Sequence, residues 1–252
     1  MLTSFKITGK VTRAMEIYRH YSFDLWLTLI KSNPLFKKQR CRIFHQQYNA
    51  LNKPLDEVEF IFRQVDLMCN NINEATGKNI DAEEMYLMVI SQLNDNKAGL
   101  HDIDIHALYL QMETLLFEFM PLIYSPDTPE ILAHIKENPD CTTNILSNTG
   151  FIKGVTLRKV LKTLNIEPYF DFQLYSDEAG LSKPNTAFFR LLLDQVAAFR
   201  SIPANQIVHI GDNIRADIWG AEMAGIQGFQ VNSNNIPLVK LIPDATQHLF
   251  FA

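Results

Sequence analysis

Asp24 is the side chain whose position most strongly suggests chemistry. It directly follows an apolar run that contains Tyr21 and Phe23, and Thr28 comes four residues later. A carboxylate at the end of a strand can act as a nucleophile, and a nearby hydroxyl can order its loop. Trp26 lies between them, and its indole N–H is a donor only, so it cannot act as a general acid or base at neutral pH. The segment therefore predicts a nucleophile without a proton donor in its own loop.

Further polar side chains lie where later strands end or helices begin. They are Ser147 with Asn148, Lys183, and Asp212 with Asp217. Taken singly, each has an ordinary structural interpretation as a cap, a turn residue or a surface charge. In an open parallel sheet, however, ligands bind beyond the carboxyl ends of the strands, where loops from several strands converge. We therefore expect these side chains to meet Asp24 at one edge of a sheet.

The chain after about residue 127 alternates between strand and helix patterns. We expect strands at about 21–26, 142–147, 172–175, 207–211 and 228–231, and helices at about 152–164, 185–199 and 213–224. Such alternation is typical of a parallel sheet with helical crossovers. The sequence therefore predicts an α/β core of the doubly wound, Rossmann-like type, formed by residues 1–32 and 126–252.

Residues 33–125 carry helical patterns without a convincing strand. Asn33-Pro34 begins a helix towards residue 50, Gly77 ends a second helix, and Asp81 with Glu84 forms a capping box for a third. A fourth helix is expected at about 106–123. The sequence therefore predicts an all-helical cap domain inserted after the first strand.

The composition indicates a soluble globular protein that binds a small molecule. The net charge is −5 and 47% of the residues are hydrophobic, so the chain has no basic surplus for nucleic acid or an anionic membrane. Three widely spaced cysteines indicate neither a disulfide framework nor a zinc site. No apolar stretch is long enough for a membrane span. We expect a cytoplasmic monomer or homodimer.

The order of these motifs resembles the haloacid dehalogenase superfamily. Its four signature motifs match Asp-x-x-x-Thr at Asp24, Ser-Asn at Ser147, Lys-Pro at Lys183, and Gly-Asp followed by a second Asp at Asp212 and Asp217. The resemblance covers the first strand and nearly all of the chain after residue 127, whereas the helical insert resembles only the architecture of the superfamily's cap domains.

The resemblance implies a Mg2+-dependent phosphatase that acts on a small phosphorylated metabolite through an aspartyl phosphate on Asp24. The implied metal ligands are Asp24, the backbone carbonyl of Trp26, Asp212 and Asp217; the implied phosphate-binding residues are Ser147, Asn148 and Lys183; Thr28 would order the loop. The chain departs from the family pattern at Trp26, where phosphatases have a second Asp that moves the proton. The departure predicts slow turnover or a restriction to substrates with good leaving groups.

Relatives without that Asp suggest alternatives. Haloacid dehalogenases have Tyr there and use no Mg2+, phosphonatases have Ala and a cap lysine, and transport ATPases have Thr. Lysines (Lys53, Lys78, Lys97) and histidines (His45, His101, His106) of the insert are available to supply missing chemistry, but no spacing singles one out. A further alternative is a binding or regulatory protein that keeps the fold and the metal site without useful turnover.

Overall fold

The structure is a computed structural model that describes residues 18–241, so the ends of the predicted core segments lie outside the described residues. Its central sheet has five strands: β1 (His20–Phe23), β4 (Thr142–Ser147), β5 (Phe172–Tyr175), β6 (Ile207–Gly211) and β7 (Gln227–Gln230). Their order across the sheet is β5-β4-β1-β6-β7, and every pairing is parallel.

The chain winds outward from β1 in both directions. It first forms β4 and β5 on one side, then crosses back to form β6 and β7 on the other side. The carboxyl ends of β4 and β6 therefore flank that of β1, which is the switch point where ligands bind in such sheets. The predicted doubly wound α/β fold is confirmed.

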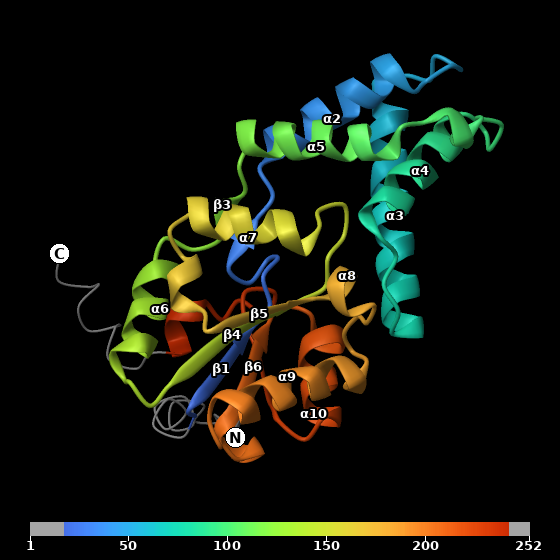
Figure 1. Ribbon diagram of the computed structural model, residues 1–252. Coiled ribbons are helices and arrows are strands. Elements are labelled where there is room, and N and C mark those ends of the chain that lie inside the picture. The colour runs from blue at the N-terminus through green and yellow to red at the C-terminus, as the bar shows by residue number, and fades with distance from the viewer. Residues whose placement is uncertain (1–17, 242–252) are drawn as a thin grey trace, which may run out of the picture.

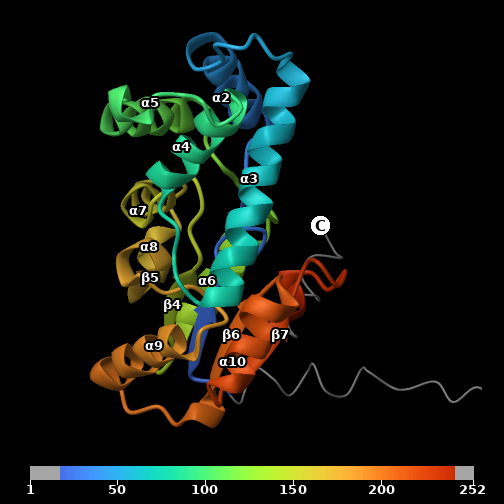
Figure 2. The same cartoon turned by 90° about the vertical axis from the view of Figure 1, so that its right-hand side faces the viewer.

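Helices cover both faces of this sheet (Figures 1 and 2). They are α6 (Thr128–Glu137), α7 (Gly154–Thr163), α8 (Ser176–Ala179), α9 (Thr186–Phe199) and α10 (Gly220–Met223), with short segments η2 (Glu167–Tyr169), η3 (Ala204–Gln206), η4 (Ile214–Trp219) and η5 (Leu238–Leu241). Leu157 of α7 belongs to the apolar cluster that includes Tyr21 and Phe23 of β1. Phe188 of α9 belongs to a second cluster, with Leu146 of β4. Successive strand residues point to opposite faces, so one sheet buries side chains in two layers.

The insert between β1 and β4 contains the four predicted helices, which lie above the carboxyl end of the sheet (Figure 1). They are α2 (Pro34–Gln47), α3 (Leu55–Thr76), α4 (Ala82–Leu93) and α5 (Ile105–Glu118), with a short turn η1 (Leu100–Asp102). The predicted capping signals are present. The Asn33 side chain accepts from the N–H of Leu35, Asp81 and Glu84 form the capping box, and Gly77 ends α3 with a φ of 67°. Helix α3 runs from the helical layer down to the sheet (Figure 2).

One predicted boundary is wrong where the chain leaves the insert, and a short strand follows there. The last helix of the insert ends at Glu118 rather than near residue 123, because Pro121 disfavours helical backbone at the residue before it. The following strand β3 (Leu122–Ile123) pairs antiparallel with β2 (Ile30–Lys31). This two-stranded ribbon joins the insert to the sheet.

The first strand and the last helix also differ from the prediction. Strand β1 ends at Phe23 rather than residue 26, because the chain turns: the N–H groups of Leu29 and Ile30 both donate to the Leu25 carbonyl. The helix predicted at 213–224 consists of a π-helical segment, η4, followed by α10. The last strand lies one residue earlier than predicted.

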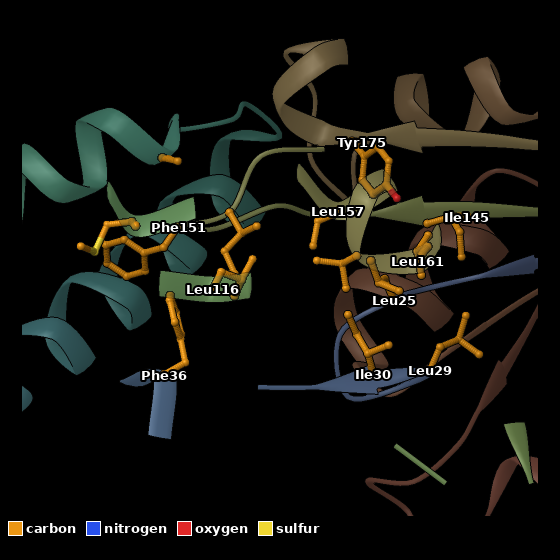
Figure 3. Packing of buried hydrophobic residues seen from close by; sticks show 14 of the residues in the cluster. Leu25, Leu29, Ile30, Phe36, Leu116, Ile145, Phe151, Leu157, Leu161 and Tyr175 are labelled. Atoms are coloured by element: carbon orange, nitrogen blue, oxygen red, sulfur yellow. The ribbon is translucent and has the colours of Figure 1, made fainter. Parts of the chain in front are cut away.

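One continuous apolar cluster connects the insert to the sheet. Figure 3 shows Leu25, Leu29 and Ile30 beside Leu157 and Leu161, with Phe36, Leu116 and Phe151 farther along the same cluster. The insert is thus packed on the sheet through buried side chains. Among the described residues, no helix combines the length and the apolarity required to cross a membrane.

Candidate active site

Asp24 lies at the carboxyl end of β1 and is almost fully buried. Its backbone N–H still donates to Ile210 of β6, at 2.8 Å, so the sheet fixes its position. One carboxylate oxygen, Oδ1, accepts from the Ser147 hydroxyl at 3.3 Å, and the other, Oδ2, accepts from the Thr28 hydroxyl at 3.2 Å. The structure therefore brings together the residues predicted from the first two motifs, and the predicted role of Thr28 in ordering the loop stays a prediction.

Lys183 reaches the same carboxylate from the loop after α8. Its ammonium group lies 2.8 Å from Asp24 Oδ1 and 2.6 Å from Asp217 Oδ1, and it donates to the Leu146 carbonyl at 2.7 Å. Burial alone would lower the pKa of Lys183, but the two carboxylates raise it above its ordinary value. A permanent positive charge is therefore held between the first and fourth motifs.

His209 is a buried neighbour that the sequence prediction missed. Its Nε2 lies 3.4 Å from Asp217 Oδ1 and 3.5 Å from the Lys183 ammonium, and its Nδ1 lies 2.9 Å from the Ser22 hydroxyl. Burial, then the Lys183 charge, lower its pKa to about 4, so the ring is neutral at pH 7. The available signal was a polar residue inside the apolar run 207–211 of a central strand. The His209 ring of β6 thus contacts both Lys183 and Asp217 and helps to fix their positions.

The side chains of Asp24, Asp212 and Asp217 form a cluster of oxygen ligands. One carboxylate oxygen from each lies within 4.8 Å of the others. Burial and then repulsion from the other two carboxylates raise the pKa of Asp212 to about 7. Burial alone would raise the pKa of Asp217, but Lys183 and His209 lower it. Such crowding of partly desolvated carboxylates fits a hard divalent cation such as Mg2+, which prefers oxygen ligands.

Asn148 and Trp26 have different surroundings. The Asn148 side chain forms two hydrogen bonds with the backbone of Lys183, accepting from its N–H at 2.7 Å and donating to its carbonyl at 3.0 Å. Its amide thus positions the lysine, and its predicted phosphate contact stays a prediction. Trp26 is partly buried against the apolar cluster and lines the cleft above Asp24. Leu27, the next residue, has a φ of 60°, which is a strained value for leucine.

A cleft of about 1260 Å³ extends from these carboxylates between α2 and α3. Its floor contains Asp24, Lys183, Asp212 and Asp217, and its upper walls contain side chains of the insert that include Phe36, Arg40, Phe62, Arg63 and Asp66. Neither the three histidines nor the three lysines considered from the sequence are among the residues that line it. Asp66 and Arg40, which the sequence prediction did not single out, are.

Helix α3 is fixed to the loops that carry Lys183 and Asp212. The Gly77 carbonyl accepts from the Ser182 N–H at 3.1 Å and from the Asn185 amide at 3.1 Å. Glu74 accepts from the Asn213 amide at 3.0 Å. The insert therefore closes one side of the cleft directly over the carboxylate cluster.

Comparison with known proteins gives the family. The sequence profile of haloacid dehalogenase-like hydrolases matches residues 18–225, which include every residue of the cluster. The chain belongs to the haloacid dehalogenase-like hydrolases.

Curated relatives of this hydrolase match only part of their own length. A haloacid dehalogenase-like hydrolase domain-containing protein 3 of Xenopus laevis is 30% identical over 40% of the chain and 41% of that protein. The ribulose-1,5-bisphosphate 5-phosphatase of Halopiger xanaduensis is 28% identical over 62% of the chain and 61% of that protein. The matched stretch thus spans about two fifths to three fifths of these relatives.

Solved structures share the fold of this hydrolase. The magnesium-bound HAD-hydrolase YfnB of Bacillus subtilis superposes with a TM-score of 0.66 at 18% identity, covering 92% of the chain and 99% of that structure. A 2-haloacid dehalogenase of Pseudomonas syringae superposes with a TM-score of 0.59 at 19% identity, covering 86% and 88%. Both likenesses concern the fold.

Proposed function

We propose that this hydrolase is a Mg2+-dependent phosphatase that acts on a small phosphorylated substrate through an aspartyl phosphate on Asp24. The observation that carries the proposal is the cluster itself. Three carboxylates lie with their oxygens within 4.8 Å of one another, and Lys183 is paired at 2.8 and 2.6 Å with two of them. A purely structural core would not concentrate so much charge, because burying it is costly.

The residues around Asp24 suit phosphoryl transfer. The Asp24 carboxylate attacks phosphorus, the bond to the leaving oxygen breaks, and water then releases phosphate from the acyl phosphate and restores the carboxylate. Lys183 and Ser147 donate to the oxygens where negative charge gathers. Asp24, Asp212, Asp217 and the Trp26 carbonyl would hold Mg2+, which would reduce the repulsion between the carboxylate and the phosphate.

Trp26 supports the restriction to good leaving groups. A proton donor in that position normally contributes about a hundredfold to ten-thousandfold. Without one, an alkoxide must leave unprotonated or obtain its proton elsewhere. We therefore expect faster turnover of acyl and aryl phosphates than of alkyl phosphates. A named phosphatase among the relatives and the magnesium-bound neighbour also support the proposal.

The direct test is trapping of the phosphoenzyme. Acetyl phosphate labelled in the phosphoryl group should transfer label to the protein in the presence of Mg2+ and leave Asp24→Asn unlabelled. A hydroxylamine-labile label that maps to Asp24 supports the proposal. The second candidate is a binding protein that keeps the fold without turnover, and Trp26 is the observation in its favour. It would be supported if no activated phosphate labels the protein. Halide release from 2-haloacids without added metal would instead identify a dehalogenase.

A further inference from the structure

Arg40 on α2 is a buried arginine that the catalytic cluster does not use. It is 7% exposed, whereas the other basic residues of the insert that line the cleft, including Lys37 and Arg63, are exposed. Its Nε is sealed from solvent and has no hydrogen-bond acceptor among the described residues. A buried charge without a partner is costly, so its retention needs an explanation.

Three aromatic rings hold the guanidinium in place. Its central carbon lies 4.1 Å from the ring centre of Phe62, 4.6 Å from that of Phe151 and 5.5 Å from that of Phe36. Stacking on ring faces compensates part of the desolvation and fixes the plane of the group. It leaves the N–H edge, which is the part that binds carboxylates and phosphates in two-point fashion.

Tyr86 of α4 is a buried neighbour of Arg40 behind the wall of the cleft. The Tyr86 hydroxyl is also buried without a hydrogen-bond partner among the described residues. Burial raises the pKa of Tyr86 to about 12, and the nearby Arg40 charge works against that rise. The ring of Tyr86 also packs against Phe151, with centroids 5.0 Å apart. The Tyr86 hydroxyl and the Arg40 guanidinium, whose Nε has no acceptor among the described residues, thus lie close together.

The pocket is connected to the catalytic cluster. Arg40, Phe36, Phe62 and Phe151 line the same cleft as Asp24 and Lys183. Phe151 follows Ser147, which donates to Asp24, by only four residues. The positive charge of Arg40 also acts on Asp66: burial raises the pKa of this carboxylate, and the arginine charge opposes the rise. Asp66 nevertheless forms no ion pair with Arg40 among the described residues.

We propose that Arg40 binds a second anionic group of the substrate, a carboxylate or a further phosphate, while the phosphoryl group lies at Asp24. The inference rests on the proposed function for the role of Asp24. The substrate class is then a small phosphate ester that carries a second anion. Arg40 is a specificity residue in this account, since it would bind the part of the substrate that does not react.

Equilibrium binding of inert phosphonates tests the inference without turnover. The probes are ω-carboxyalkyl phosphonates with one to three methylene groups, the corresponding alkyl phosphonates and the corresponding bisphosphonates, titrated calorimetrically in the presence of Mg2+. We expect at least one doubly anionic probe to bind at least tenfold more tightly than its alkyl counterpart. Comparison of the carboxylate and bisphosphonate arms identifies which anion fits.

Arg40→Met should remove this preference and leave alkyl phosphonate affinity within twofold. Arg63→Met is the matched control, because it removes an exposed charge from the same cleft and should preserve the preference. Thermal unfolding shows whether each variant folds; methionine occupies a similar volume, so Arg40→Met should fold at least as stably as the wild type. Arg40→Lys should restore part of the preference.

The outcomes separate the two proposals. If neither the carboxyalkyl phosphonates nor the bisphosphonates bind more tightly than the alkyl phosphonates, or if folded Arg40→Met keeps the preference, the inference is wrong whatever the result of phosphoenzyme trapping. If the preference depends on Arg40 but no phosphoenzyme forms, the anion pocket stands and the phosphatase proposal fails.

Discussion

At the scale of single residues, the carboxylate of Asp24 contacts three side chains that suit the proposed phosphoryl transfer. Ser147 and Lys183 donate to its Oδ1, and Thr28 donates to its Oδ2. Position 26 provides an indole ring instead of an acid. The distinction between binding a phosphoryl group and protonating its leaving group is therefore the property that single substitutions can test.

Trp26→Asp should increase the turnover of alkyl phosphates. An acid beside the nucleophile can donate to the leaving oxygen, so we expect kcat to rise about a hundredfold for alkyl esters and much less for aryl esters. Steady-state phosphate release measures both. Trp26→Asn is the control, because asparagine has nearly the same shape as aspartate but is not an acid, and it should show no gain. An equal gain in both variants would mean that the indole ring only obstructs the cleft.

Asp212→Asn should stabilise the metal-free protein near neutral pH. The folded-state pKa of Asp212, about 7, lies above its ordinary value of 3.8, so its favourable contribution is complete below about pH 4 and is lost as pH rises towards 7. Because Asp212 is partly exposed, solvent screening limits the gain at pH 7.5 to about 1 kcal/mol. Urea unfolding in EDTA at pH 4.5 and 7.5 measures it, and a constant difference at both pH values would contradict the assignment.

At the scale of elements, the contact of α3 with the catalytic loops decides how the insert closes the cleft. Gly77 ends this helix in the left-handed region, and a Cβ there would lie 2.6 Å from the Asn185 amide nitrogen. The Gly77 carbonyl accepts a hydrogen bond from the N–H of Ser182, the residue before Lys183. A small change at the end of one helix should therefore reach the site.

Gly77→Ala should destabilise the protein by about 2 kcal/mol, through left-handed strain and displacement of Asn185. Gly180→Ala is the matched control, because Gly180 ends α8 with a similar φ of 63° but has nothing within 4 Å of the added Cβ. It should cost about 1 kcal/mol from strain alone. Equal losses in chemical denaturation would show that the contact with Asn185 contributes nothing.

Most elements could be predicted from the sequence, because strand and helix periodicities are local. Three strands, 142–147, 172–175 and 207–211, have the predicted bounds, since each is a short apolar run bounded by polar residues. The ribbon formed by β2 and β3 could not be predicted: its two-residue strands lie some ninety positions apart and become strands only by pairing. Pro121 was the one local sign that the helix before β3 ends early.

The site residues were predictable to the extent that chain order places them at strand ends. Asp24, Ser147, Lys183 and the two aspartates of the last motif converge as expected. His209 and Arg40 were not predictable, because their roles come from burial beside groups distant in the chain. The one local sign of His209, a polar residue inside the apolar run 207–211, does not distinguish a site residue from an ordinary core histidine, and Arg40 has no comparable sign.

At the scale of the whole molecule, the insert and the sheet share one apolar cluster. Polar contacts between α5 and α7 add to this cluster. The hydroxyls of Tyr109 and Thr156 are hydrogen-bonded at 2.9 Å, and Lys159 forms an ion pair with Glu113 at 2.8 Å. The insert and the core therefore share one interior. The predicted domain boundaries, at 32/33 and 125/126, stay a prediction.

We expect the protein to unfold in a single cooperative transition. Buried side chains shared between the two parts make separate unfolding expensive. Differential scanning calorimetry should give a calorimetric enthalpy equal to the van't Hoff enthalpy. Two resolved transitions would instead show that the helical insert is a separate cooperative unit and that the closed arrangement is weakly held.

The central claim is that Asp24, Asp212, Asp217 and Lys183 form one phosphoryl-transfer site. A crystal structure with Mg2+ and fluoroberyllate tests it most directly, because fluoroberyllate forms a phosphate-like adduct with a carboxylate nucleophile. We predict beryllium bound to the Asp24 carboxylate, Mg2+ held by the three aspartates and the Trp26 carbonyl, and fluorine atoms in contact with Lys183 and Ser147. A structure in which neither beryllium nor Mg2+ binds at Asp24 at saturating concentrations would contradict the claim.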